Sequence, residues 1–434
     1  MFLSSARGLR PLAATLVALL ATACQTTPPA PTTAPIVKDH RGELVSVELV
    51  RTVPRDEGVQ AANEFHYSEQ LGEPACGVKV YRLLFKTVGV KGEPEQTSGA
   101  MVVPDGCPAP YTVMGLAPGT RVKAGDQTAD RVKTFFAGYG YVIVMVDYLG
   151  LGASDYPYHP YLHADSEATA MIDGLRAAKA AIAQEGIPVA GPMVLTGASQ
   201  GGHSVLATQR AIEADYADEF QIAAVMASSG PYSMTDTFLD GWQGLTTAGP
   251  NPLASILFSY TLYSYQQVYG NLYDSPTEVW QAPYSDMVDD YFPGPLNLIE
   301  LWQSGEFPPI QNLATLREPA FVDAVASDPD HPFRQNLAAN DLLDWTPKAP
   351  LLLCGSSGDA VVDFKNSETA YKTFKAAGAN VTLLDTKPFL PEGLNGFQHH
   401  AAGGGTACTI AALKSAFGPV RQAVLTATGA TATP

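Results

Sequence analysis

A serine between two glycines is the residue of this chain best suited to covalent chemistry. The segment Gly197–Gly201 reads Gly-Ala-Ser-Gln-Gly and follows one residue after the apolar run Met193–Leu195. At a sharp turn from a buried strand into a helix, this pattern lifts a serine hydroxyl off the sheet, and side chains at the glycine positions would collide with neighbouring backbone. The helix N-terminus, with the N–H of Gln200, would face a developing oxyanion. Ser199 is therefore the predicted nucleophile; an incidental serine in a glycine-rich turn is the alternative.

A serine hydroxyl needs a base, and the base needs a group that orients it. In hydrolases with this turn, the partners follow in the order Ser, Asp or Glu, His. The apolar run Ala349–Cys354 predicts another buried strand, and Asp359 stands just past its carboxyl end. An acid at this place would orient an imidazole from below. The alternative for Asp359 is a cap for the helix that is predicted to begin near Phe364.

Two adjacent histidines, His399 and His400, end the loop after the next predicted strand, Val381–Leu384. Adjacent residues in a loop point in different directions, so only one of the two would reach Ser199. We favour His400 as the base, because it directly precedes the small residues that begin the last predicted helix, and His399 is the alternative. The other histidines are predicted to be structural: His40, His66, His159, His163, His203 and His331.

The elements that must position these residues alternate between strand and helix from Tyr111 to Ser229. This alternation predicts an α/β fold with a mostly parallel, doubly wound sheet. The alternation breaks over an aromatic-rich stretch at 232–345, where residues 256–263 suggest a helix with a broad apolar face. We expect a catalytic domain at 41–231 and 346–434, with 232–345 inserted as a helical cap or lid. The alternative is a helical subdomain whose aromatic residues fill only its own core.

The motifs resemble the α/β-hydrolase superfamily and, within it, the secretory lipase family typified by fungal lipase A. Besides the serine turn, the similar segments are Gly140–Gly150, Ile172–Ala177, Gly358–Val362 and Ala376–Val381, within roughly residues 75–418. The resemblance implies an α/β-hydrolase fold with Ser199 as nucleophile, Asp359 as acid and His400 or His399 as base. The doubled histidine departs from the fungal pattern.

Two positions are candidates for completing the oxyanion hole beside Gln200. The resemblance implies that Asp147 helps to build the hole, and a loop-capping carboxylate is the alternative reading of this residue. General topology favours Gly119, in the loop Leu116–Arg121 that follows the apolar strand Tyr111–Met114, where many hydrolases offer a backbone N–H.

The N-terminal residues predict export. Arg7 and Arg10 precede a short apolar stretch that ends at Ala21, which is typical of a signal peptide and too short for a spanning helix. Cys24 at the junction resembles the lipidated cysteine of a bacterial lipoprotein, and Gln25 after it favours the outer membrane or cell surface. We therefore expect a signal peptide at 1–23, a Pro/Thr-rich tether at 24–40 and membrane attachment through a lipid anchor. An ordinary signal peptide on a secreted or periplasmic protein is the alternative.

Four cysteines follow Cys24, namely Cys76, Cys107, Cys354 and Cys408. An even number in an exported chain suggests disulfide bonds. Val78–Phe85 and Ser98–Val103 are predicted to be the arms of a hairpin, which would bring the first two cysteines together at its open end. The other two are either bridged near the active site or buried as small apolar residues.

Charge excludes nucleic acid as a partner. The chain carries a net charge of −17, and loss of Arg7 and Arg10 with the signal peptide would make it more acidic. An acidic surface repels phosphate backbones. Neither a metal nor an organic cofactor is expected. The spacing of Asp155, His159, His163 and Asp165 matches no tight ligand motif, and the serine chemistry needs neither group.

The expected function is hydrolysis of a small-molecule or lipid ester through an acyl-enzyme on Ser199. A carbohydrate acetyl esterase or a serine peptidase would use the same residues on another substrate. A surface lipoprotein that uses a hydrolase scaffold only for binding is the alternative from another class.

Overall fold

The computed structural model describes residues 40–131, 136–240 and 244–429. Nine strands in these residues form one sheet in the order β1-β2-β3-β5-β4-β6-β7-β10-β11. Their bounds are β1 (Leu44–Val53), β2 (Gly77–Val88), β3 (Pro94–Asp105), β4 (Thr112–Ala117), β5 (Tyr141–Val146), β6 (Met193–Ala198), β7 (Ile222–Ser228), β10 (Leu351–Gly355) and β11 (Val381–Asp385).

The sheet is antiparallel at one side and parallel over the rest. Strands β1, β2 and β3 pair antiparallel, and β3 pairs antiparallel with β5. From β5 through β4, β6, β7 and β10 to β11 every pairing is parallel. The carboxyl ends of β4, β6 and β10 therefore meet at one edge of the sheet, as expected for the predicted mostly parallel α/β sheet.

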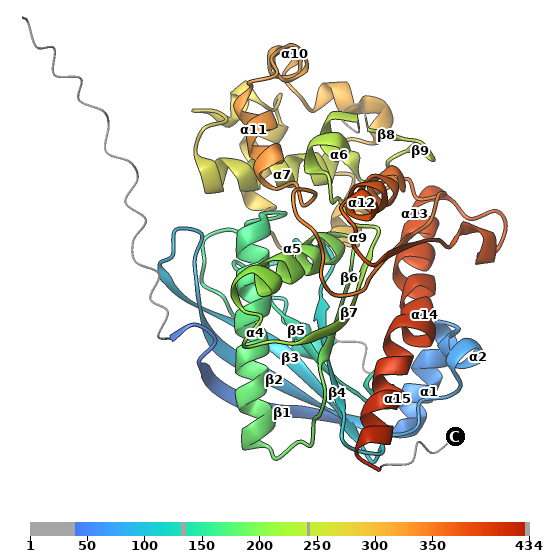
Figure 1. Ribbon diagram of the computed structural model, residues 1–434. Helices are drawn as coiled ribbons and strands as arrows, with labels where there is room; N and C mark the ends of the chain where they lie inside the picture. The colour runs from blue at the N-terminus through green and yellow to red at the C-terminus, as the bar shows by residue number, and fades with distance from the viewer. Residues whose placement is uncertain (1–39, 132–135, 241–243, 430–434) are drawn as a thin grey trace, which may run out of the picture.

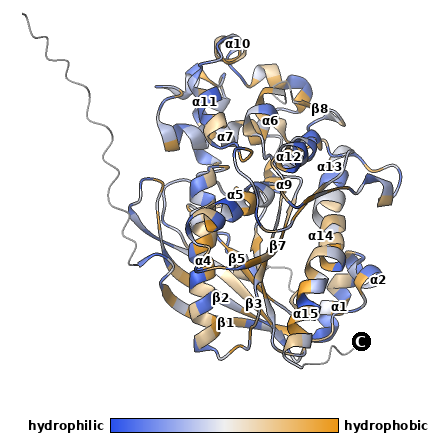
Figure 2. Ribbon diagram, viewed as in Figure 1, coloured by the Kyte–Doolittle hydropathy of each residue, from blue (hydrophilic) through white to orange (hydrophobic). Residues whose placement is uncertain are grey.

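Helices cover both faces of the sheet (Figure 1). Helices α4 (Ala164–Gln184), α5 (Gln200–Asp215) and α12 (Lys365–Ala376) share an apolar core with one face, which includes Leu195 and Leu353. Helix α14 (Cys408–Ala412) packs on the other face of the sheet, in an apolar cluster with Val194 and Leu352. Helix α3 (Thr128–Arg131) contributes to the same cluster. The central strands are accordingly dominated by hydrophobic residues, whereas α12 presents many hydrophilic ones (Figure 2). Strands that are apolar at nearly every position are what a sheet buried on both faces requires.

The remaining helices belong to the segment before β2, to the C-terminal segment around α14, or to the insertion. Helices α1 (Arg55–Glu64) and α2 (Tyr67–Leu71) precede β2, while α13 (Gly396–Gln398) and α15 (Gly418–Ala427) flank α14 in sequence. Between β7 and β10 lie α6 (Met234–Asp240), β8 (Leu245–Thr246), β9 (Gly249–Pro250), α7 (Ala254–Tyr269), α8 (Tyr284–Met287), α9 (Leu298–Ser304), α10 (Pro319–Ser327) and α11 (Pro332–Ala339).

The insertion has an apolar core that continues into the catalytic domain. Tyr260, Trp280 and Phe292 are fully buried in it, and the same cluster includes Tyr161 and Leu162 from the loop before α4. In Figure 1 the insertion stands above the edge where the parallel strands end. Most of its aromatic side chains thus build its own core, which the sequence had offered as the simpler reading.

The described residues contain two disulfide bonds. Cys76–Cys107 confirms the predicted hairpin bridge, and Cys354–Cys408 decides the second pair, which the sequence left open between a bridge and two buried thiols. Cys76–Cys107 closes the open end of the β2–β3 hairpin, where Gly77 pairs with Asp105. Cys354–Cys408 joins β10 to α14.

The predicted signal peptide at 1–23, the predicted lipidation site Cys24 and all but the last residue of the predicted tether at 24–40 lie outside the described residues. Within the described residues, none of the helices combines the length and the apolar character needed to cross a bilayer.

Candidate active site

Ser199 occupies the turn between β6 and α5 with strained backbone angles, φ 59° and ψ −125°. Its N–H donates to the carbonyl of Ser228 at the end of β7. A Cβ added to Gly197 would lie 2.1 Å from the carbonyl oxygen of Gly201, and a Cβ added to Gly201 would lie 2.2 Å from that of Ala117. Both glycines are therefore required by close backbone approach, and a strained residue held by its surroundings is typical of functional sites.

Asp359 lies in the loop after β10 and its side chain is buried. Oδ1 accepts the N–H groups of Val361 and Val362, at 2.8 and 3.0 Å. Oδ2 accepts from Nδ1 of His400, at 2.7 Å. One oxygen thus shapes the loop and the other orients an imidazole. Asp359 does not cap the following helix α12, whose N-cap residue is Phe364, so the alternative interpretation as a helix cap is wrong.

The structure separates the two adjacent histidines. Because Nδ1–H of His400 is directed at the carboxylate, Nε2 is the nitrogen available to accept a proton. His399 instead places Nδ1 2.9 Å from Oγ of Ser356, and its ring packs on Gly358, where an added Cβ would lie 2.6 Å from it. Of the two, His400 is therefore the residue that Asp359 orients.

Both histidines lie within a helix rather than at the end of a loop, where the sequence had placed them. Asn395 caps the helix with Gln398 as its reciprocal partner, and a π-helical stretch, His399–Ala407, follows α13 directly. A π-helical stretch widens the turn, and such segments recur at functional sites. The sequence signal that could have shown this is Asn395-x-x-Gln398, a capping box.

Glycines after His400 allow this helix to approach the strand ends closely. An added Cβ would lie 2.7 Å from Cβ of Ser356 at Gly403 and 2.2 Å from Oγ of Ser229 at Gly404. The carbonyl of Gly404 accepts a hydrogen bond from Ser228 Oγ, at 2.5 Å. These positioning residues were missed in the sequence, although three consecutive glycines inside a predicted helix are a signal of close packing.

The loop after β4 passes beside the serine. An added Cβ at Gly119 would lie 4.0 Å from Cβ of Ser199 and 3.4 Å from the carbonyl oxygen of Ala198. Strand β4 extends through Ala117, three residues further than predicted. The N–H of Gln200 belongs to the first turn of α5, where no acceptor within the helix is available. Gly119 and Gln200 therefore both lie where an oxyanion hole for Ser199 would form.

Asp147 has a different place from the one the resemblance implied. Its backbone N–H donates to the carbonyl of Ser98, and its side chain is fully buried. The carboxylate accepts from Ser98 Oγ, from Thr128 and from Arg121. With its N–H already used, Asp147 is no oxyanion donor, and its ion pair with Arg121 instead anchors the loop that begins at Gly119.

A cavity that is partly open to solvent borders Ser199 and Gln200. Its wall includes Val361 and Val362 from the loop that Asp359 shapes, so the nucleophile and the acid loop face the same space. The insertion contributes apolar residues, among them Leu257 and Phe258, and polar ones: Thr237, Thr246 and Asn251.

Two buried histidines that the sequence had assigned to packing lie close to the serine turn. His159 contacts the side chain of Gln200 through Nε2, at 2.8 Å, and His203 lies 2.8 Å from a carboxylate oxygen of Glu167. Burial lowers the pKa of His159 to about 3, so it is neutral. Glu167 was missed in the sequence because nothing local marks the first turn of α4 as a neighbour of α5.

These features place the chain in a known family. A family model described as the alpha/beta hydrolase family matches residues 124–364, more than half of the chain, and the protein belongs to this family.

Among solved structures, the rice cell wall degrading esterase LipA from Xanthomonas oryzae has 36% sequence identity and a TM-score of 0.82, over 88% of this chain and 100% of that one. A putative hydrolase from Legionella pneumophila has 24% identity and a TM-score of 0.75, over 87% and 97%. Candida antarctica lipase A in its closed state has 17% identity and a TM-score of 0.57, over 80% and 76%. The last two show a shared fold alone. The search of curated proteins gave no match.

Proposed function

We propose that the protein is an exported serine hydrolase that cleaves carboxylic esters through an acyl-enzyme on Ser199. The observation that carries the proposal is the 2.7 Å hydrogen bond between His400 and Asp359 at the strand edge where Ser199 stands in its strained turn. Similarity to an esterase over the whole length of that protein supports ester hydrolysis among the reactions that such a site performs.

The reaction follows from the placement of these groups. Oγ of Ser199 attacks the carbonyl carbon of the ester while Nε2 of His400 takes its proton, and Asp359 stabilises the resulting imidazolium. The oxyanion is received by the N–H of Gln200 and by the loop at Gly119. His400 then gives the proton to the leaving alkoxide, and water repeats the sequence on the acyl-enzyme to release the acid.

The cavity suits an ester with two unlike parts. Leu257, Phe258 and Val361 offer an apolar wall for an acyl group, and Thr237 and Thr246 line the same space with hydroxyl groups. A second candidate function, removal of acyl groups from a carbohydrate, is favoured by the similarity to an esterase described as degrading rice cell walls. Both functions use the same serine and differ in the alcohol that is released.

Export and anchoring are part of the proposal. Two disulfide bonds support an oxidising compartment. Lipidation of Cys24 would hold the enzyme at the outer membrane or cell surface through the tether. Detergent phase partition of wild type and Cys24→Ala tests this: the wild type should enter the detergent phase and the variant the aqueous phase. Wild type in the aqueous phase would favour an ordinary signal peptide.

The central test is hydrolysis of p-nitrophenyl esters from acetate to palmitate by the full chain, beside Ser199→Ala. Turnover that depends on Ser199 and rises toward long chains would indicate a lipase. A maximum at acetate, with release of acetate from acetylated xylan, would indicate the carbohydrate esterase. Failure of Ser199 to react with a fluorophosphonate, with no turnover of any ester, would overturn the proposal in favour of a binding protein.

A further inference from the structure

A buried polar network lies beneath the serine turn, and Gln200 is its nearest member to Ser199. Gln200 is 1% exposed. Its Nε2 donates to Oε1 of Glu167, at 2.7 Å, and to Nε2 of His159, at 2.8 Å. Nδ1 of His159 faces the carbonyl of Leu149, at 2.9 Å, so Nδ1 carries the proton and Nε2 is the acceptor. Both N–H groups of the Gln200 side-chain amide therefore donate to an acceptor, one to Glu167 and one to His159.

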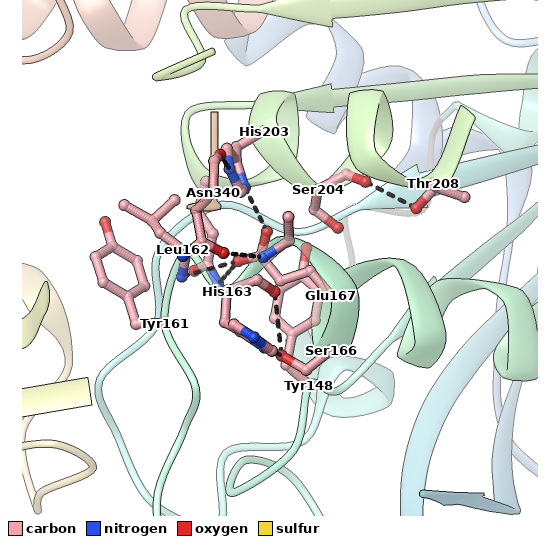
Figure 3. A network of polar contacts seen from close by, with 12 residues as sticks. Tyr148, Tyr161, Leu162, His163, Ser166, Glu167, His203, Ser204, Thr208 and Asn340 are labelled. Carbon is pink, nitrogen blue, oxygen red and sulfur yellow. Dashed lines mark hydrogen bonds and ion pairs between the residues drawn. The ribbon is translucent and has the colours of Figure 1, made fainter. Parts of the chain in front are cut away.

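Glu167 connects this amide to the next turn of α5. Its Oε2 lies 2.8 Å from Nδ1 of His203, and its Oε1 also accepts the N–H of Leu162, at 3.2 Å. The side chains of Glu167 and His203 are 1% and 0% exposed. The carboxylate thus receives hydrogen bonds from Gln200, His203 and Leu162, and Figure 3 shows it between the serine helix and the loop before α4.

His203 also contacts the insertion. Its Nε2 lies 3.1 Å from the backbone carbonyl of Asn340, which can only accept, so Nε2 carries a proton. Asn340 follows α11, the last helix of the insertion; its Oδ1 accepts the N–H of Ala164 and its Nδ2 donates to Tyr269 OH, both at 2.8 Å. Tyr269 ends α7, the helix whose first residues line the cavity. The network therefore joins the serine turn to the insertion.

We propose that Glu167 and His203 are positioning residues for ester hydrolysis. Glu167 fixes the side chain of Gln200 and with it the backbone N–H that receives the oxyanion, and His203 holds Glu167 in place while tying α5 to Asn340. The inference rests on the proposed function, because the position of this N–H matters only if Ser199 forms an oxyanion. Burying these polar side chains is costly compared with apolar packing, whereas a displacement of about 1 Å at a reacting group costs roughly 10²-fold in rate.

The first test compares Glu167→Ala and Glu167→Gln with Glu213→Ala, using p-nitrophenyl butyrate. Glu213 is a matched control, since it is a buried carboxylate at the far end of α5 that accepts the N–H groups of Lys348 and Ala349. We expect Glu167→Ala to lower kcat by about 10²-fold with little change in KM. Glu167→Gln should restore most of kcat, because its amide oxygen still accepts from Gln200 and its amide nitrogen can donate to His203. Glu213→Ala should lower Tm and leave kcat near that of the wild type.

A second pair of variants decides the matter if Glu167→Ala does not fold. In His203→Asn, the side-chain amide nitrogen lies near the position of Nδ1 in the wild type and keeps the hydrogen bond to Glu167. In His203→Gln, the side-chain amide nitrogen lies near the position of Nε2 in the wild type and keeps the hydrogen bond to Asn340. We expect His203→Asn to retain kcat within a few-fold and His203→Gln to lose about tenfold or more, as expected for a sub-ångström displacement.

Two results would overturn the inference: a folded Glu167→Ala with the kcat of Glu213→Ala, or equal kcat for the two His203 variants. Wild type without turnover that depends on Ser199 would instead remove the proposed function itself, and the positioning role with it. The Ser199→Ala comparison in the same assay distinguishes these failures.

Discussion

Nδ1 of His400 lies 2.7 Å from Oδ2 of Asp359, although 41 residues separate them in the sequence. The second oxygen of the carboxylate accepts two N–H groups of its own loop, so the carboxylate has one orientation. The imidazole is thereby held in the tautomer whose Nε2 can accept a proton. This relationship is the basis of the first two predictions.

Replacing Asp359 with Asn should abolish most activity while leaving the fold intact. The Asn side-chain amide would present either an N–H donor or a weaker acceptor to Nδ1 of His400. This favours the tautomer in which Nε2 carries the proton and cannot accept one from Ser199. We therefore expect kcat to fall by about 10⁴-fold with KM little changed. The measurement is p-nitrophenyl ester hydrolysis. Asp385→Asn is the control, because this carboxylate at the end of β11 accepts the N–H groups of Ser357 and Lys387, and the variant should keep most activity. Retention of a tenth of wild-type kcat by Asp359→Asn would contradict the assignment.

The two adjacent histidines should differ sharply when each is replaced with Ala. His400→Ala removes the base and should lower kcat by about 10⁴-fold or more. His399→Ala removes a hydrogen bond to Ser356 and packing on Gly358, so it should reduce Tm and lower kcat less than tenfold. Rates for the two variants at equal folded concentration decide between them. A larger loss for His399→Ala would exchange the roles.

The fold could be predicted from the sequence because local signals coincide with it. The apolar runs that precede Ser199 and Asp359 became β6 and β10, and the paired cysteines of the β2–β3 hairpin are bridged. The limits of elements were less predictable: β4 continues to Ala117, and the histidines lie inside a helix. Where these elements begin and end depends on how closely glycines pack against the strand ends, and no short sequence pattern predicts that packing.

The candidate site was predictable in its residue types and less so in its contacts. The motif and the chain order indicated Ser199 and Asp359. Because His399 and His400 are adjacent, the sequence did not decide which of them is the base. Asp147 was assigned by resemblance, and only tertiary contacts reveal that its N–H bonds Ser98 and its carboxylate pairs with Arg121. Glu167 was missed because α4 and α5 approach each other only in the folded chain.

The glycines of the serine turn should be intolerant of a single methyl group. Gly201→Ala would place Cβ 2.2 Å from the carbonyl oxygen of Ala117, and Gly197→Ala would place it 2.1 Å from that of Gly201. Backbone must shift in both, and we expect a loss of about 1–3 kcal/mol in unfolding free energy together with most of the activity. Urea denaturation measures the first effect and ester hydrolysis the second.

Gly405→Ala is the control for these variants. It lies in the helix after His400, and an added Cβ would meet nothing within 4 Å. Because Ala has a higher helix propensity than Gly, we expect Gly405→Ala to leave the free energy of unfolding unchanged or to raise it by up to about 1 kcal/mol. Equal stability of Gly201→Ala and Gly405→Ala would show that the turn relaxes freely.

Removal of the Cys354–Cys408 disulfide should affect both stability and activity. The bridge joins β10, which leads to Asp359, to the helix that carries His400. Cys354→Ala with Cys408→Ala should cost about 3–4 kcal/mol in unfolding free energy and lower kcat by about tenfold through displaced partners. Removal of Cys76–Cys107 should cost a similar free energy with kcat unchanged, because that bridge closes a distant hairpin. Equal effects of the two removals on kcat would contradict the link to the site.

Buried His159 should make the fold less stable in acid. Burial lowers its pKa to about 3, whereas an unfolded chain binds this proton near pH 6.5. As the pH falls below about 6.5, the unfolded state takes up a proton that the folded state refuses. The free energy of unfolding therefore decreases by up to ~1.4 kcal/mol per pH unit until about pH 3.

Urea denaturation at pH 4, 5, 6 and 7 measures this slope in the wild type and in His159→Asn, whose amide can still donate to the carbonyl of Leu149. The variant should be less stable at pH 7, because Gln200 loses an acceptor, and its stability should fall less steeply between pH 6.5 and 4. His66→Asn serves as the control for the substitution itself, because His66 is exposed and has a left-handed backbone that Asn tolerates. Equal slopes for His159→Asn and the wild type would mean that His159 accepts its proton in the folded state, in which case the hydrogen bond from Gln200 could not persist in acid.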